Sequence, residues 1–177
     1  QGHASAQNNL GYMYRAGIAV EQNFERAIMW YTNAARQGYA EAQSGLAFMY
    51  QKGQGVPVDI SKAIGLYETA SAQGEVTAQF NLGLIYLTGE GVGRDLGKAA
   101  KWLTVAASQG DADAQYYLGT LYRNGWGVAQ DIGQALRWYR LADELGNTAA
   151  KHEINALEAE LSASLQPATA THAVASR

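Results

Sequence analysis

The sequence predicts an all-α fold, a solenoid of four 36-residue helix–turn–helix repeats that ends in a C-terminal capping helix. The main evidence is a glycine that recurs every 36 residues without a slip, at Gly2, Gly38, Gly74, Gly110 and Gly146. We call these the boundary glycines. Each period also holds two helical patterns of apolar residues with a glycine-rich stretch between them. Twenty glycines with only two prolines indicate repeated tight turns rather than disorder.

The first half of each repeat has the apolar spacing of a helix with one buried face. An alanine, a leucine and a tyrosine follow the boundary glycine by four, eight and twelve residues, as in Ala42, Leu46 and Tyr50. This first helix is expected to end where a left-handed residue favours glycine, at Gly17, Gly53, Gly89 and Gly125. A Gly-x-Gly-Val loop follows in the last three repeats, and the first repeat has Ala19 in place of the second glycine.

The second helix of each repeat is expected to begin after a side chain that can cap free backbone amides. These N-cap residues are Asn23, Asp59, Asp95 and Asp131. Small and large side chains then alternate along the helix, as in Ala135, Trp138, Tyr139 and Ala142. Such alternation lets two close helices interdigitate, so the Trp and Tyr residues are predicted to lie in the core.

The terminal segment lacks the repeat pattern but keeps helical spacing. Its apolar residues are Ala150, Ile154, Leu157, Leu161 and Leu165. Glu153, Glu158 and Glu160 are expected to form the water-facing side of a cap. Residues 1–2 are predicted to be the end of a preceding repeat. The four repeats are predicted at residues 3–146, with the bounds 3–38, 39–74, 75–110 and 111–146. The capping helix is predicted at 147–166 and a disordered tail at 167–177.

Composition and residue spacing exclude several classes of function. A net charge of −3 argues against a nucleic-acid binder, and no apolar run is long enough for direct membrane insertion. The absence of cysteine excludes disulfides, thiolate metal sites and a cysteine nucleophile. His3, His152 and His172 have no partners at metal-ligand spacing. We therefore predict no metal site, no cofactor, no catalytic residue and no enzymatic activity.

Two local patterns have plausible chemical interpretations that we reject. Gly89, Gly91 and Gly93 suggest a phosphate loop, but a nucleotide fingerprint requires a preceding strand and the motif recurs once per repeat. Turn formation explains it better. Asp111 and Asp113 open a first helix, where negative charge suits the helix dipole, so we assign them to helix electrostatics rather than catalysis.

The repeat resembles the Sel1-like repeat, which is related to the tetratricopeptide repeat. The third copy carries the motif residues Ala78, Leu82, Gly83, Tyr86, Gly89, Gly91, Val92, Asp95, Lys98, Ala99 and Trp102. The tetratricopeptide repeat has a period of 34 and ends in proline, so it fits less well. The resemblance implies a right-handed superhelix from a bacterium that binds proteins or peptides and performs no chemistry. It also implies a location in the cell envelope or periplasm.

The binding face is predicted from helical geometry. In tetratricopeptide-like solenoids the first helices line the concave surface, and the side opposite the core stripe faces the groove. Aromatic residues with arginine at the rim are typical of a binding hot spot. The candidate partner-binding residues are Tyr12, Arg15, Phe48, Gln51, Lys52, Phe80, Leu84, Leu87, Tyr116 and Arg123. Alternatively, some of them pack against neighbouring helices. Trp126 lies in a loop and either contacts a partner or folds back on the loop.

Three functions are compatible with these patterns. The first is a scaffold that binds a peptide or protein surface in the concave groove. The second is a regulatory or targeting arm of a larger protein whose catalytic domain lies outside residues 1–177. The third is a cell-wall or carbohydrate-binding module, which would need a row of exposed aromatic rings. We expect a monomer, or weak self-association through exposed repeat ends.

Overall fold

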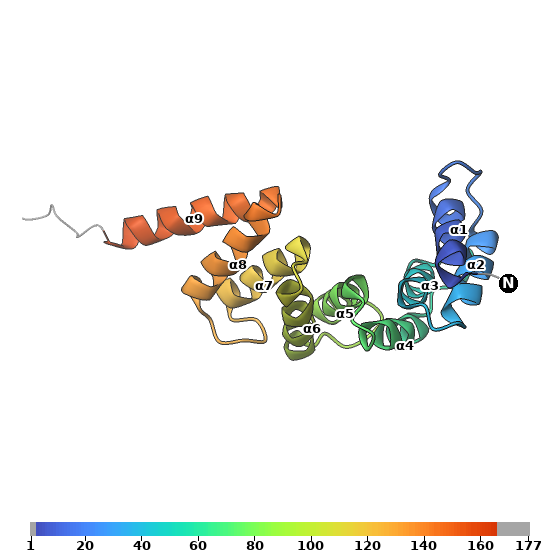
Figure 1. Cartoon of the computed structure of the whole chain (residues 1–177). Helices are drawn as coiled ribbons and strands as arrows, with labels where there is room; N and C mark the ends of the chain where they lie inside the picture. The colour runs from blue at the N-terminus through green and yellow to red at the C-terminus, as the bar shows by residue number, and fades with distance from the viewer. Residues whose placement is uncertain (1–2, 166–177) are drawn as a thin grey trace, which may run out of the picture.

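A computed structural model describes residues 3–165, in which every regular element is an α-helix. The helices are α1 (Ala4–Ala16), α2 (Phe24–Ala35), α3 (Ala40–Lys52), α4 (Ile60–Ser71), α5 (Val76–Thr88), α6 (Leu96–Ser108), α7 (Ala112–Asn124), α8 (Ile132–Glu144) and α9 (Thr148–Leu165). Figure 1 shows them following one another in an extended, curved row, with α1 and α2 at one end and α9 at the other. The predicted all-α repeat fold with a C-terminal helix is confirmed. The preceding repeat predicted at 1–2 and the disordered tail predicted at 167–177 lie outside the described residues.

The helix ends follow from the capping residues that the sequence contains. The Asp59 carboxylate accepts a 2.9 Å hydrogen bond from the Lys62 backbone amide, and Asn23, Asp95 and Asp131 make the equivalent bond. Each satisfies an amide that has no partner within the first helical turn. The four first helices, α1, α3, α5 and α7, end at glycines with φ between 66° and 77°. The predicted N-caps and glycine stops are therefore confirmed.

The first helices inside the array are buried on two sides, as the third repeat illustrates. Ala78, Leu82 and Ile85 on α5 are 0 % exposed and pack against α4 of the preceding repeat. Gly83 faces α6 of its own repeat, and a Cβ there would lie 2.6 Å from Cγ of Leu103. A small residue at this point therefore allows α5 and α6 to approach closely.

The second glycine of the loop is required by close packing between repeats. A Cβ on Gly127 would lie 2.0 Å from the carbonyl oxygen of Leu96, in the first turn of α6. A Cβ on Gly91 would lie 2.4 Å from Cγ1 of Ile60, in the first turn of α4. The first repeat has no preceding second helix among the described residues, and Ala19 occupies the same loop position at φ 60°. The second loop glycine is therefore explained by its left-handed turn conformation together with the close approach of the preceding repeat.

A ladder of glutamine pairs links the turn after the second helix to the first helix in each of the first three repeats. The side-chain amide nitrogens of Gln37, Gln73 and Gln109 donate to the side-chain oxygens of Gln7, Gln43 and Gln79 at 2.6, 2.8 and 2.6 Å. In the fourth repeat the donor is replaced by Leu145, which is exposed. Gln115 Oε1 is consequently buried without a hydrogen-bond partner in the described part of the chain.

The terminal helix α9 takes the place of a first helix in a fifth repeat. Ala150, Ile154 and Leu157 are buried against α8, as their counterparts are in earlier repeats, whereas Leu161 is exposed. Glu158 and Glu160 of α9 are exposed, as expected for the water-facing side of a cap, whereas Glu153 is half-buried, and all three also form ion pairs. Glu158 forms an ion pair with Arg140 at 2.9 Å, and the other two pair with a residue of α7 described below.

Candidate functional site: a groove across the first helices

A hollow of about 500 Å³ lies across the first helices of the first three repeats. It is lined by Tyr12 and Arg15 from α1, by Phe48 from α3 and by Phe80 from α5. The structure thus brings together four of the ten candidate binding residues. Tyr12 is 48 % exposed, whereas Phe48 and Phe80 are half-buried with one side packed on the core. The groove therefore combines exposed aromatic surface with rings that are held in place.

Arg15 occupies a central place in this groove. Its guanidinium carbon lies 5.0 Å from the ring centroid of Phe48 and 5.4 Å from that of Tyr12, so two aromatic rings hold it by cation–π contact. Within residues 3–165 no carboxylate lies within 4.0 Å of the guanidinium nitrogens. Arg15 is thus an oriented cation whose ionic partner is not supplied by the described chain.

The hollow exists because α3, the first helix of the second repeat, has a glycine at the position that faces it. Gly45, seven residues after its boundary glycine, has no side chain, and the ring of Tyr31 lies 2.7 Å from where its Cβ would be. Both residues line the hollow. Burial raises the pKa of the Tyr31 hydroxyl, and the nearby Arg15 guanidinium opposes that shift. In the fourth repeat the equivalent of Gly45 is Tyr117, whose ring packs 5.9 Å from that of Phe80 and fills the corresponding space.

Three of the remaining candidates contact neighbouring parts of the array. Gln51 is buried; its side chain accepts a 3.0 Å hydrogen bond from the Tyr67 hydroxyl and donates a 2.8 Å bond to Glu90. Lys52 lies 3.6 Å from the same Glu90 carboxylate. Leu87 packs against two core clusters, and half-buried Leu84 does not line the hollow. The alternative that some candidates pack between helices is therefore correct for Gln51 and Leu87.

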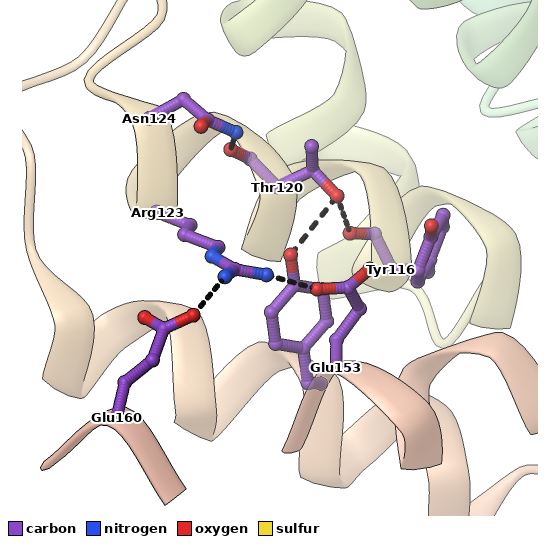
Figure 2. A network of polar contacts seen from close by, with 7 residues as sticks. Tyr116, Thr120, Arg123, Asn124, Glu153 and Glu160 are labelled. Atoms are coloured by element: carbon purple, nitrogen blue, oxygen red, sulfur yellow. Dashed lines mark hydrogen bonds and ion pairs between the residues drawn. The ribbon is translucent and has the colours of Figure 1, made fainter. Parts of the chain in front are cut away.

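The terminal helix covers the last of the candidate binding residues, Tyr116 and Arg123 of α7 (Figure 2). Arg123 forms ion pairs with Glu153 and, at 2.7 Å, with Glu160, both on α9. The Tyr116 ring packs 5.7 Å from the Tyr139 ring. Arg123 therefore does not stand at a free rim, because α9 supplies its counter-ions. Extending the 36-residue register into the terminal helix would have indicated this contact, since Glu153 lies seven residues after Gly146.

The loop candidate Trp126 contacts the loop of the preceding repeat rather than its own loop, and its contact with a partner stays a prediction. Its ring remains exposed, and the Arg94 guanidinium carbon of the preceding repeat lies 5.4 Å from its centroid. Sequence reasoning missed Tyr31 as a groove residue because its position matches the core pattern of the second helices, and it missed Gly45 because a glycine offers no side chain to a partner. Whether the second-helix tyrosine faces an open groove depends on the residue that the next repeat has seven positions after its boundary glycine. This position is occupied by Asn9, Gly45, Asn81 and Tyr117 in the four repeats.

The described residues offer no site for chemistry by metals. No group of three or more His, Asp or Glu side chains is arranged to hold a metal ion in residues 3–165. In the same range no helix has both the length and the apolar character that a bilayer crossing requires.

A tandem array of helix hairpins with a groove along its first helices defines the chain as a helical-repeat solenoid. The model of the Sel1 repeat matches four consecutive segments, residues 4–39, 40–75, 76–111 and 112–147. The chain belongs to the Sel1 repeat family. Proteins of this family generally mediate protein–protein interactions as non-catalytic scaffolds.

Solved structures of bacterial proteins resemble this fold. A Sel1 repeat protein from Oxalobacter formigenes is 39 % identical with a TM-score of 0.78, and the match covers 89 % of this chain and 45 % of that one. A protective antigen of uropathogenic Escherichia coli that displays an SLR fold is 36 % identical with a TM-score of 0.85, covering 90 % of this chain and 34 % of that one. This chain thus spans less than half the length of either relative. No curated protein sequence matches the chain.

Proposed function

We propose that this chain is an interaction scaffold that docks a segment of a partner protein in the groove across α1, α3 and α5. The observation that carries the proposal is the hollow lined by Tyr12, Phe48 and Phe80 with Arg15 between the rings. Aromatic side chains and arginine are enriched where binding energy concentrates, because they bury large areas at a low cost in side-chain entropy. The proposal also agrees with the general role of Sel1 repeat proteins.

The polar lining of the groove suits a peptide backbone. Asn8, Asn9 and Asn81 line the same hollow, and an asparagine amide offers both donors and an acceptor. An extended segment presents unpaired peptide N–H and C=O groups, which need both kinds of partner. A volume of about 500 Å³ is suited to a few side chains rather than to a folded domain.

The carbohydrate-binding alternative has less support. A sugar platform needs adjacent exposed rings, and the large exposed aromatic residues among those described are Tyr12 and Trp126. These belong to α1 and to the loop between α7 and α8, with different surroundings. A groove with mixed apolar and amide lining therefore favours a protein segment as the ligand.

Site-specific photocrosslinking tests the proposal. Tyr12 and Ile18 lie in the same repeat and are 48 % and 49 % exposed, but only Tyr12 lines the groove. Each is replaced separately by benzoylphenylalanine in cells that express the protein. We expect partner crosslinks from position 12 and few from position 18. Equal crosslinking from both positions, or crosslinks from position 18 alone, would place binding elsewhere.

A loss-of-binding variant complements the crosslinks. Tyr12→Ser removes an exposed groove ring that belongs to no core cluster, so the helical circular dichroism signal should be unchanged while capture of the crosslinked partner falls. Phe80 is less suitable, because its ring also packs on the core and against Tyr117. Ile18→Ser is the matched control and should retain full capture.

A further inference from the structure

We propose that Arg15 and the hollow beside Gly45 form a subsite for one glutamate side chain of the docked segment, so that the preferred partners are glutamate-bearing, otherwise apolar peptides. This inference rests on the proposed function, because it names the chemistry of the segment that the groove takes. The array contains a second copy of this site, at Arg123, and there a glutamate of the chain itself is bound.

The filled copy lies at the end of the array. Arg123 and Arg15 occupy the same register, each thirteen residues after its boundary glycine. Arg123 binds the carboxylate of Glu153 and, at 2.7 Å, that of Glu160 (Figure 2). An arginine at this position is therefore oriented towards carboxylates of α9, the helix that takes the place of the next first helix.

The copy at Arg15 shares the arginine and the second-helix tyrosine with the filled copy, but it lacks the acid. Glu153 stands seven residues after its boundary glycine, and the corresponding residue beside Arg15 is Gly45. The Glu153 carboxylate lies near Tyr139, whose pKa it helps to raise, and the corresponding residue of the first repeat is Tyr31. Arg15, Gly45 and Tyr31 all line the hollow. The hollow thus corresponds to the space that a glutamate side chain occupies in the last repeat, and a partner can supply the carboxylate.

The subsite is suited to one carboxylate rather than two. The second acid at the filled copy is Glu160, and its register equivalent in the second repeat is Lys52, which pairs with Glu90. Tyr12 and Phe48 hold the guanidinium of Arg15 from two sides, so little side-chain freedom remains to be lost on binding.

Two acids at the far end of the groove disfavour a polyacidic ligand. Glu41 and Glu75 line the hollow at the start of α3 and α5, whereas Arg15 lies near the end of α1. The Glu75 carboxylate accepts hydrogen bonds from the backbone amides of Thr77 and Ala78 and is therefore committed to capping α5. The groove accordingly has a cationic end and an anionic end, which favours a single glutamate at Arg15 and sets the direction of the peptide.

Peptide display on the immobilised full chain tests the inference. A random twelve-residue library is selected against wild type, Arg15→Gln and Arg15→Glu, and the peptides recovered are measured by fluorescence anisotropy. Arg137→Gln is the matched control, because Arg137 also lies over an aromatic ring, Trp138 at 6.0 Å, but on α8 away from the groove. Circular dichroism verifies that each variant is folded.

Wild type should select peptides with one recurrent glutamate next to apolar residues. Changing that glutamate to glutamine should weaken binding about tenfold, as expected for a half-buried charge-assisted hydrogen bond. Arg15→Gln should remove this discrimination, Arg15→Glu should shift selection to lysine- or arginine-bearing peptides, and Arg137→Gln should behave as wild type. A purely structural role for Arg15 would not produce this reversal.

The outcomes separate this inference from the proposed function. Suppose that the selected peptides bind Tyr12→Ser more weakly than wild type, but either lack glutamate or bind Arg15→Gln as tightly as wild type. This result would overturn the carboxylate subsite and leave groove docking in place. Peptides that are insensitive to both Tyr12 and Arg15, or the recovery of no peptide, would count against groove docking and therefore against the inference as well.

Discussion

Replacing Gly127 by alanine should destabilise the array far more than the same replacement at Gly125, two residues earlier in the same loop. Both residues have left-handed φ angles, 72° and 69°, so each alanine incurs a conformational cost of about 1 kcal/mol. At Gly125 the nearest atom to an added Cβ is Cβ of Gln130 at 3.3 Å, which can move slightly. At Gly127 it is the Leu96 carbonyl oxygen at 2.0 Å, with the carbonyl carbon at 2.4 Å.

The contact at position 127 is with the backbone of α6, at Leu96. Relieving it requires α6 and the loop to move apart by about 1 Å, because non-bonded atoms need about 3 Å. Overpacking of this kind costs about 1–3 kcal/mol beyond the conformational term. We therefore expect a loss of about 1 kcal/mol for Gly125→Ala and of about 3 kcal/mol for Gly127→Ala, measured by urea unfolding followed at 222 nm. Equal losses in the two variants would refute the argument that inter-repeat packing, and not turn geometry alone, requires the second glycine.

Three further predictions concern other parts of the structure. Leu145→Gln should stabilise the protein by about 1 kcal/mol, because it restores the missing donor to buried Gln115 Oε1; an unchanged urea midpoint would contradict the ladder. Burial raises the pKa of the Asp111 carboxyl, so this group favours folding at low pH and loses that contribution as the pH rises through its folded pKa. Asp111→Asn, which keeps a capping oxygen, should therefore gain stability relative to wild type between about pH 3 and about pH 7, as judged by melting temperature. Leu118→Ala should cost about 2–5 kcal/mol in urea unfolding, whereas Leu161→Ala on exposed surface should change stability by less than about 0.5 kcal/mol.

Much of the fold could be predicted from the sequence because it depends on local patterns that recur. The N-cap residues, the glycine stops and the Ala–Leu stripe act within one helix or between adjacent helices. Each prediction was therefore supported by four copies. The role of the loop glycine was predicted as a turn, but its contact with the preceding second helix required the three-dimensional arrangement.

The groove was less predictable, because the environment of a residue there depends on the next repeat. Four residues share the register thirteen after the boundary glycine, yet their environments differ. Arg15 contacts two aromatic rings, Gln51 a buried hydroxyl, Leu87 the core and Arg123 two carboxylates. Helical periodicity places all four on one side of the helix, but only the neighbouring side chains decide which of them remains available to a partner.

The array is consequently different at its two ends. Tyr117 and α9 close the groove over the fourth repeat, whereas Gly45 opens it over the first three. The binding function that we propose is therefore confined to the N-terminal half of the chain. The ion pairs of Arg123 have a structural role, since they attach α9 to α7.

The most direct test of the central claim is a crystal structure of the chain with the tightest peptide from the display selection. We predict that the peptide lies across α1, α3 and α5, in contact with Tyr12 and Phe48, and with a glutamate carboxylate at hydrogen-bond distance from Arg15. A peptide seated instead on the second helices, or on the loops around Trp126, would contradict the assignment of this groove as the binding site.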